Sequence, residues 1–157
     1  MLLLKGQEAF TAWPHQALVK IGNIFSWATI PENTMICKEG EISPIIAFIQ
    51  EGSCDVFRKL NVKETLSNGK EVIKTKQVII GSLGKYKSLG EISLLDQTPM
   101  MYSLVTKEKV RVIQADEQKL QSLDLDVRLL LRQSCSLEYH NITKVILPCY
   151  KYLLLYL

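Results

Sequence analysis

The amino-acid sequence predicts a mainly β fold: an eight-stranded antiparallel β-roll, similar to a jelly roll, with helices at its two ends. Short runs of β-branched and aromatic residues recur about every ten residues, and turn-forming Gly, Asn and Pro residues separate them. Helical spacing of apolar residues is confined to the two ends and to one short interruption between strands. A chain of 157 residues that is 47% hydrophobic and 22% charged is long enough for one domain with a buried core.

The chain divides into three parts. Residues 1–23 are predicted to form an N-terminal helical segment, with a short helix from Glu8 to Ile21. Residues 24–123 are predicted to form the roll, whose first strand begins at Ile24. Residues 124–157 are predicted to form an amphipathic C-terminal helix, followed by an apolar tail after Pro148.

A long hairpin is predicted in the middle of the roll. Asn68-Gly69 lies between two strand-like arms, and an Asn-Gly pair in that setting is the strongest short hairpin signal. The stretch from Arg58 to Lys87 holds eight basic and two acidic residues. An anionic membrane or a nucleic acid is one interpretation, but aromatic residues do not interleave with the lysines of the hairpin. We therefore interpret the stretch as a solvated face whose lysines protect the hairpin edges.

Simple counts argue against several classes of function. A net charge of +3 is too small to indicate a nucleic-acid-binding protein. The histidines, His15 and His140, lie near opposite ends of the chain and are too few for the metal site of a catalytic roll. The sequence has no Gly-x-Ser-x-Gly motif or phosphate-binding loop, and nothing in it places an activated Cys–His pair. We therefore expect no metal, no nucleic-acid partner and no enzymatic activity.

The cysteines and the two chain ends predict a cytoplasmic protein. The cysteines have no Cys-x-x-Cys spacing, and Cys37 and Cys54 fall in strand-like runs as small buried hydrophobes. The leucines at the N-terminus form too short a run for a secretion signal. The apolar C-terminal tail is interrupted by lysines and Pro148, so no transmembrane segment is expected.

The stretch LGEISLLDQTPMMYS, residues 89–103, carries the candidate site. Gly90 permits a tight turn, after which residues 91–95 are predicted to form one helical turn. Unpaired amides at the start of a helix favour an anion such as a phosphate. The carboxylate of Glu91 suits a sugar hydroxyl, which would donate a hydrogen bond to it. A ligand that joins a ribose to a phosphate satisfies both groups.

This pattern resembles the cyclic nucleotide-binding domain family, shared by the regulatory subunits of cAMP-dependent kinase, the bacterial catabolite activator and cyclic-nucleotide-gated channels. The family cassette reads approximately FGELALxxxxPRAA, and six residues align with it: Gly90, Glu91, Ile92, Ser93, Leu94 and Pro99. Two further motifs match, KEGE at residues 38–41 and IIAFIQEGSCDVF at residues 45–57, so the resemblance covers about residues 24–123. It implies the same β-roll, a non-catalytic regulatory role, and cAMP or cGMP as ligand with Glu91 on the ribose 2′-hydroxyl.

The cassette departs from the family at its methionines. The arginine that pairs with the cyclic phosphate in the family aligns with Met100, which cannot form such a pair. Loss of a charge-assisted hydrogen bond, worth about 1.5–3 kcal/mol, predicts nucleotide binding that is weaker by tens to hundreds of fold. Met101 and Tyr102 stand where the family has small residues and are large enough to fill the pocket, while Ser103 keeps a hydroxyl near the site.

Other interpretations of the same residues remain open. Methionines commonly fill gaps in a core, and a carboxylate such as that of Glu91 is stabilised near a helix N-terminus without any ligand. Lys85 or Lys87, in the preceding loop, could supply the missing charge. We predict a regulatory domain with a weak or lost cyclic-nucleotide site, formed by Gly90, Glu91, Ile92, Ser93, Met100, Met101 and Ser103. The alternative is a module of the same fold that binds an unknown protein partner or fills its pocket with its own tail.

Overall fold

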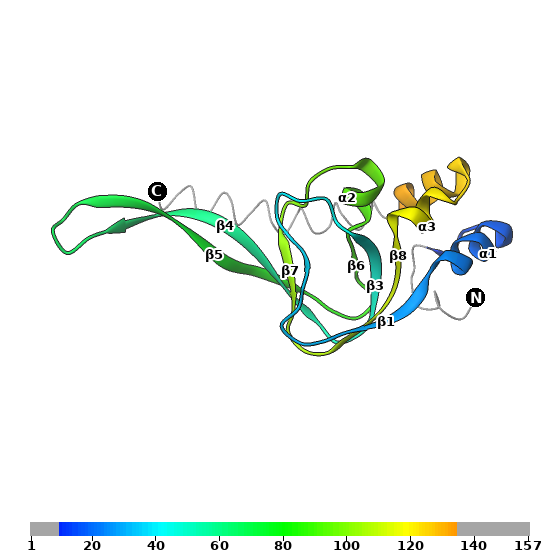
Figure 1. Cartoon of the computed structure of the whole chain (residues 1–157), viewed down its shortest axis with the longest axis horizontal. Helices are drawn as coiled ribbons and strands as arrows, with labels where there is room; N and C mark the ends of the chain where they lie inside the picture. The colour runs from blue at the N-terminus through cyan, green and yellow to red at the C-terminus, as the bar shows by residue number, and fades with distance from the viewer. Residues whose placement is uncertain (1–9, 135–157) are drawn as a thin grey trace.

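The computed structural model describes residues 10–134, which form a β-roll with helices packed at one end (Figure 1). The helices are α1 (His15–Ile24), α2 (Glu91–Asp96) and α3 (Glu117–Gln121), and residues 125–134 are also helical. The strands are β1 (Ser26–Ile30), β2 (Met35–Cys37), β3 (Ile45–Glu51), β4 (Cys54–Thr65), β5 (Glu71–Leu83), β6 (Ser88–Leu89), β7 (Ser103–Thr106) and β8 (Val110–Asp116). The predicted mainly β fold is confirmed.

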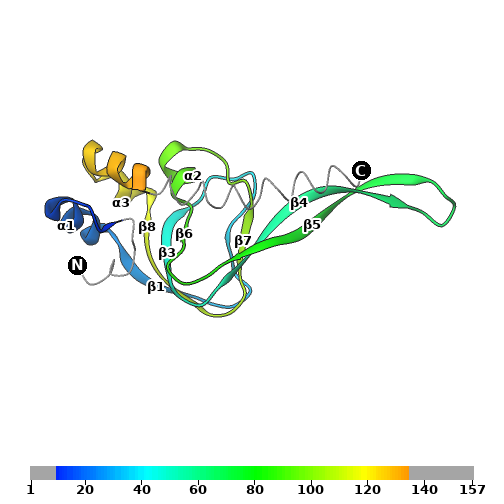
Figure 2. The same cartoon turned by 180° about the vertical axis from the view of Figure 1, so that it is seen from behind.

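The strands form two antiparallel sheets of four strands each. One sheet has the order β1-β8-β3-β6, and the other has the order β2-β7-β4-β5. The helix α2 is the predicted short interruption between strands, and it lies between β6 and β7 along the chain. Seen from behind, α1 and α3 gather at one end of the roll, and the β4–β5 ribbon extends from the other end (Figure 2).

Strand β3 is buried on both faces and separates two hydrophobic cores. Ala47 and Ile49 belong to the core between the two sheets, which includes Val56 of the opposite sheet. Ile46 and Phe48 belong to the second core, between the first sheet and the helices. This arrangement explains why the run IIAFI is continuously apolar, because a strand covered on both faces does not alternate.

Phe48 lies at the centre of an aromatic cluster in the second core. Its ring centroid is 5.3 Å from that of Phe10 and 5.5 Å from that of Phe25. Phe10 in turn packs edge-to-face on Trp13, whose Nε1–H donates a 2.8 Å hydrogen bond to Ser134 Oγ. The cluster therefore ties the segment before α1 to the end of the last described helix.

The N-terminal helix begins later than the sequence predicted. The prediction ran from Glu8 to Ile21, whereas α1 spans His15–Ile24, and residues 8 and 9 lie outside the described part of the chain. The physical reason is Pro14, which has an extended backbone (φ −57°, ψ 140°) and occupies the N-cap position. Because the helix includes Ile24, the first strand starts at Ser26 and not at Ile24 as predicted.

The predicted hairpin around Asn68-Gly69 is confirmed. The Leu66 N–H donates to the Lys70 carbonyl (2.9 Å), and the Gly69 N–H donates to the Leu66 carbonyl (2.9 Å). Gly69 has a φ of 79°, so the loop is a turn closed by a residue in the left-handed region, not the tight two-residue turn. Strands β4 and β5 pair from Thr65↔Glu71 back to Cys54↔Leu83, with one irregularity at Val56/Phe57.

The C-terminal elements match the prediction in part. Asp116 caps α3, since its Oδ1 accepts the Lys119 N–H at 2.9 Å. In the helix over residues 125–134, Val127 and Leu131 face the core, whereas Leu125 and Leu129 are exposed. The remainder of the predicted C-terminal helix and the apolar tail lie outside the described residues.

Cys37 and Cys54 are buried and free, as their positions in strand-like runs predicted. Burial raises the pKa of each thiol to about 11, because the thiolate is poorly solvated in the core. Both cysteines therefore act as small apolar residues of the roll at neutral pH.

Candidate functional site

The candidate site begins at Gly90, where the backbone makes a turn that only glycine accommodates well. Gly90 has a φ of 77° and is the N-cap residue of α2. A Cβ atom at this position would lie 2.1 Å from the Ile45 carbonyl oxygen and 2.4 Å from Ser43 Oγ. The tight turn predicted from the sequence is therefore present, and it brings the start of α2 against the loop before β3.

Ser93 fixes α2 to its surroundings through its hydroxyl group. Ser93 Oγ accepts the Ser43 N–H at 2.9 Å and donates to the Thr98 carbonyl at 2.6 Å. Ser93 and Ser43 are both almost fully buried. The hydroxyl of Ser93, a residue predicted to belong to the ligand site, thus links the loop before β3 to the loop that follows α2.

Glu91 is buried as well, with 4% of its surface exposed. Its Oε1 accepts a 2.9 Å hydrogen bond from Ser88 Oγ, which comes from β6 immediately before the turn. The carboxylate therefore faces protein groups and not solvent. Its position in the first turn of α2 is also favourable for a negative charge.

The predicted residues surround a very small cavity. Gly90, Glu91, Ile92, Ser93, Met100 and Met101 all line it, together with Thr98, Pro99 and Tyr102. Its volume is about 20 Å³, which is space for about one water molecule. Pockets for small-molecule ligands are about 300–1,000 Å³, so a nucleotide does not fit the cavity in this conformation.

The two methionines have different environments. Met100 is 6% exposed and packs in the core between the sheets together with Tyr102. Met101 is 44% exposed. Met100 therefore fills the interior where the family has its arginine, while Met101 borders the cavity from the surface.

Three other residues considered for the site do not line the cavity. Ser103 is buried, and its Oγ accepts the Glu39 N–H at 2.9 Å, which fixes the turn at residues 38–41. Lys85 and Lys87 are exposed, and the Lys85 ammonium lies 4.8 Å from the ring centroid of Tyr86. Neither lysine is positioned beside Glu91 or Met100 in the cavity wall.

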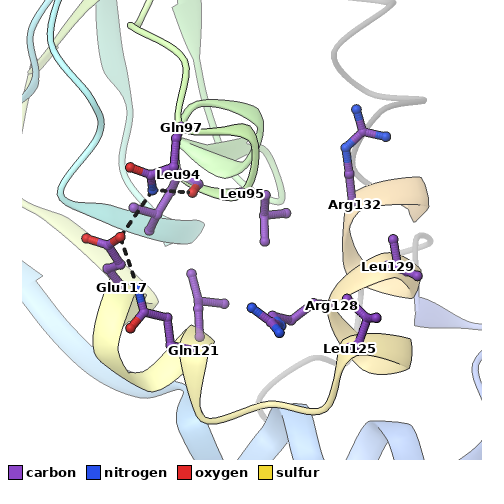
Figure 3. Close-up of a pocket in the computed structure, with 10 residues that line it drawn as sticks. Leu94, Leu95, Gln97, Glu117, Gln121, Leu125, Arg128, Leu129 and Arg132 are labelled. Carbon is purple, nitrogen blue, oxygen red and sulfur yellow. Dashed lines mark hydrogen bonds between the residues drawn. The ribbon is translucent and has the colours of Figure 1, made fainter.

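A larger groove lies on another side of α2, between that helix, α3 and residues 125–134 (Figure 3). Its volume is about 240 Å³, and its apolar wall is formed by Leu94, Leu95, Leu120, Leu125 and Leu129. At one side, Gln97 Nε2 donates to the Leu94 carbonyl (2.9 Å) and to Glu117 Oε1 (3.2 Å). The helical spacing of Leu125, Leu129 and Arg132 in the sequence corresponds to this groove-facing side of the helix.

A bidentate ion pair joins α2 to the helix over residues 125–134, two of the three helices that border the groove. Arg132 Nε lies 2.5 Å from Asp96 Oδ1, and Arg132 Nη2 lies 2.9 Å from Asp96 Oδ2. Sequence reasoning missed this pair, because the partners are far apart in the chain. It also missed Ser43, for which the only signal was a serine before a proline, one residue beyond the predicted KEGE turn.

The chain folds as a β-roll in which a short helix follows a glycine turn and lies between β6 and β7 along the chain. This arrangement is that of the cyclic nucleotide-binding domains. The chain belongs to this family: the family model "Cyclic nucleotide-binding domain" matches residues 28–124, more than half of the chain. The human "Cyclic nucleotide-binding domain-containing protein 1" is 26% identical over 111 residues, which are 71% of this chain and 26% of that protein. The chain thus spans about a quarter of the length of this relative.

Solved structures share the fold at low sequence identity. The catabolite activator protein of Thermus thermophilus superposes with a TM-score of 0.61 and 18% identity, over 92% of this chain and 62% of that chain. A triple variant of the regulatory subunit of a cAMP-independent protein kinase A from Trypanosoma brucei, bound to cAMP in its A site, has a TM-score of 0.60 and 16% identity. That match covers 89% of this chain and 44% of the other. Within residues 10–134, no helix has the length and apolar character needed to cross a membrane.

Proposed function

We propose that this chain is a non-catalytic regulatory domain of the cyclic nucleotide-binding family in which binding of cAMP or cGMP is weak or lost. The observation that carries the proposal is the filled cassette: Met100 and Tyr102 are buried beside Glu91, and about 20 Å³ remains between them. A nucleotide would have to displace packed side chains and would find no cation at position 100 for its phosphate.

The hydrogen bonds of the cassette support the same proposal. The hydroxyl of Ser93 and one carboxylate oxygen of Glu91 have partners inside the protein. Binding a ribose would exchange these contacts for new ones, so the gain from each new hydrogen bond is small. The free thiols of Cys37 and Cys54 agree with a reducing, cytoplasmic setting for the domain.

A titration of the intact chain with cAMP and then with cGMP tests the proposal. We expect no saturable heat in isothermal titration calorimetry until nucleotide reaches millimolar concentration, because the phosphate has no cationic partner. Saturation at micromolar nucleotide would contradict the proposal, since it would mean that the backbone and Glu91 suffice for binding. Circular dichroism of the same sample establishes that the protein is folded.

The substitution Met100→Arg tests whether this one position is the defect. We expect it to strengthen cAMP binding by tens to hundreds of fold, because the guanidinium can pair with the phosphate. The Trypanosoma brucei subunit offers a parallel, since one of the three changes in its cAMP-bound variant introduces an arginine. Without nucleotide we expect Met100→Arg to lower the melting temperature, since it places a charge at a buried position.

The matched control is Met101→Arg. It adds the same charge at the neighbouring residue, which is 44% exposed, and we expect little gain in affinity from it. An equal gain from both variants would point to general electrostatic attraction. A folded Met100→Arg variant with no gain would show that position 100 is not what limits binding.

A further inference from the structure

The β4–β5 ribbon extends beyond the roll as a two-stranded arm (Figures 1 and 2). We define the arm as residues 57–79. Strand β4 also pairs with β7, but only over Cys54–Phe57, and β5 is the outer strand of its sheet. Among the described strands, neither edge of the arm has a neighbouring strand beyond Phe57, although the Lys59 N–H at the β4 edge donates to Glu39 Oε2 at 2.8 Å. Open edges are where another chain can pair.

On one face of the arm, which we call the paired face, lysines lie opposite apolar residues and pair with a glutamate. Lys76 lies opposite Leu60, and Lys74 lies opposite Val62. Both ammonium groups bind Glu64, at 2.7 Å for Lys74 and 3.6 Å for Lys76. The hydrogen bond and charge of Lys74, with the charge of Lys76, hold the pKa of Glu64 below its ordinary value. We infer that the aliphatic stems of the two lysines cover Leu60 and Val62, while Glu64 pairs with their ammonium groups.

The other face, which we call the open face, has exposed apolar side chains beside lysines. Ile73 is 70% exposed and Ile79 is 57% exposed. Lys63 lies opposite Ile73, and Lys59 lies on the same face in the row of Gln77. Within residues 10–134, neither lysine forms an ion pair with a carboxylate. Glu71, opposite Thr65, is the acidic residue on this face. The face therefore offers apolar surface and, with two lysines against one glutamate, a net positive charge.

The positive charge of the arm favours an acidic partner over a second copy of the arm. It has six basic and two acidic residues, a net charge of +4 against +3 for the whole chain. Two copies of the arm would repel each other. The arm has no Trp or Tyr, and its Phe57 lies at the base where β4 pairs with β7, so it lacks residues that stack on bases or anchor in a bilayer interface.

We propose that the open face of the arm binds an extended acidic segment of a partner protein. Carboxylates of that segment meet Lys59 and Lys63, and its alternate apolar side chains cover Ile73 and Ile79. An added strand presents alternate residues to one face, which matches the spacing of Ile73 and Ile79 along β5. The proposal does not depend on whether the cassette binds a nucleotide.

The test uses the full chain and a fluorescent synthetic peptide that alternates glutamate with valine and threonine, with affinity measured by fluorescence anisotropy. We expect saturable binding that weakens as salt is added. Ile73→Thr combined with Ile79→Thr should weaken it by about tenfold or more, because apolar contact is lost while strand propensity is kept. Lys59→Gln combined with Lys63→Gln should weaken it severalfold and flatten its salt dependence.

The matched control is Lys74→Gln combined with Lys76→Gln, which removes the same charge from the paired face. We expect it to change affinity by less than about threefold. The proposal is overturned if this control weakens binding as much as the open-face variants do, or if a peptide with lysine in place of glutamate binds equally well. It is also overturned if the acidic peptide does not bind, or if phosphatidylserine vesicles or duplex DNA bind the open face more tightly than the peptide.

Discussion

The substitution Gly90→Ala is expected to lower the free energy of unfolding by about 3 kcal/mol or more. A residue with a side chain at φ 77° is strained, and the added Cβ would lie 2.1 Å from the Ile45 carbonyl oxygen. Relief of that contact requires β3 and the start of α2 to move apart, which breaks the contacts that hold the cassette. Urea unfolding followed by circular dichroism measures the loss. A variant that does not fold is consistent with the same expectation, since whole domains have about 5–15 kcal/mol of stability.

Gly22→Ala is the matched control for Gly90→Ala. Gly22 lies inside α1, and apart from its chain neighbours and the backbone of its own helix, no atom is within 4 Å of the position its Cβ would take. We expect this variant to be more stable than the parent by about 0.5–1 kcal/mol, because alanine favours a helix. If Gly90→Ala cost less than about 1 kcal/mol, the turn before α2 would be more adaptable than its geometry indicates.

The substitution Phe48→Ala is expected to lower the free energy of unfolding by about 3–5 kcal/mol. Phe48 is 1% exposed, and its ring contacts those of Phe10 and Phe25. Its removal leaves a cavity where β3 meets the helices, and aromatic contacts are lost in addition to buried area. The melting temperature and the urea midpoint should both fall.

Trp27→Ala provides the comparison for Phe48→Ala. Trp27 lies in the same row of the sheet, because both residues pair with Ile113, but it is on the outer strand and 46% exposed. Its ring stacks with Arg111, whose guanidinium carbon is 4.2 Å from the ring centroid. We expect Trp27→Ala to lower the free energy of unfolding by about 1 kcal/mol. Equal effects of the two substitutions would show that the second core tolerates a cavity at Phe48.

The strands could be predicted from the sequence because their pattern is local. Turn residues mark the ends of most strands, and the left-handed residues Gly40, Gly52 and Gly69 fall in three of those turns. The N-terminal helix was harder, because the spacing of Phe10 and Trp13 resembles a helix although these residues precede Pro14. Phe10 packs on Phe48 of β3 and on Trp13, and the contact with β3 is one that no local pattern encodes.

Six of the seven candidate residues line one cavity and Ser103 does not, and the size of that cavity could not be read from the sequence. Met100 and Met101 are adjacent and chemically identical, yet one is in the core and the other is largely at the surface. Which of them points inward depends on the backbone on both sides. Two backbone hydrogen bonds fix Met100. Its N–H donates to the Glu41 carbonyl at 2.8 Å, and its carbonyl accepts the Gly40 N–H at 2.8 Å. The orientation of Met100 thus depends on the loop at residues 38–41, which is distant in the sequence.

The hydrogen bonds of Ser93 have a consequence for how such sequences are interpreted. Ser93 and Gly90 are needed to seat α2 on the loop before β3, whether or not a nucleotide is ever bound. A chain with this structure that did not bind nucleotide would therefore still use the glycine and the serine for its own folding. In this chain Gly90 and Ser93 thus report on architecture, and the side chain at position 100 reports on whether a cation is available for a phosphate.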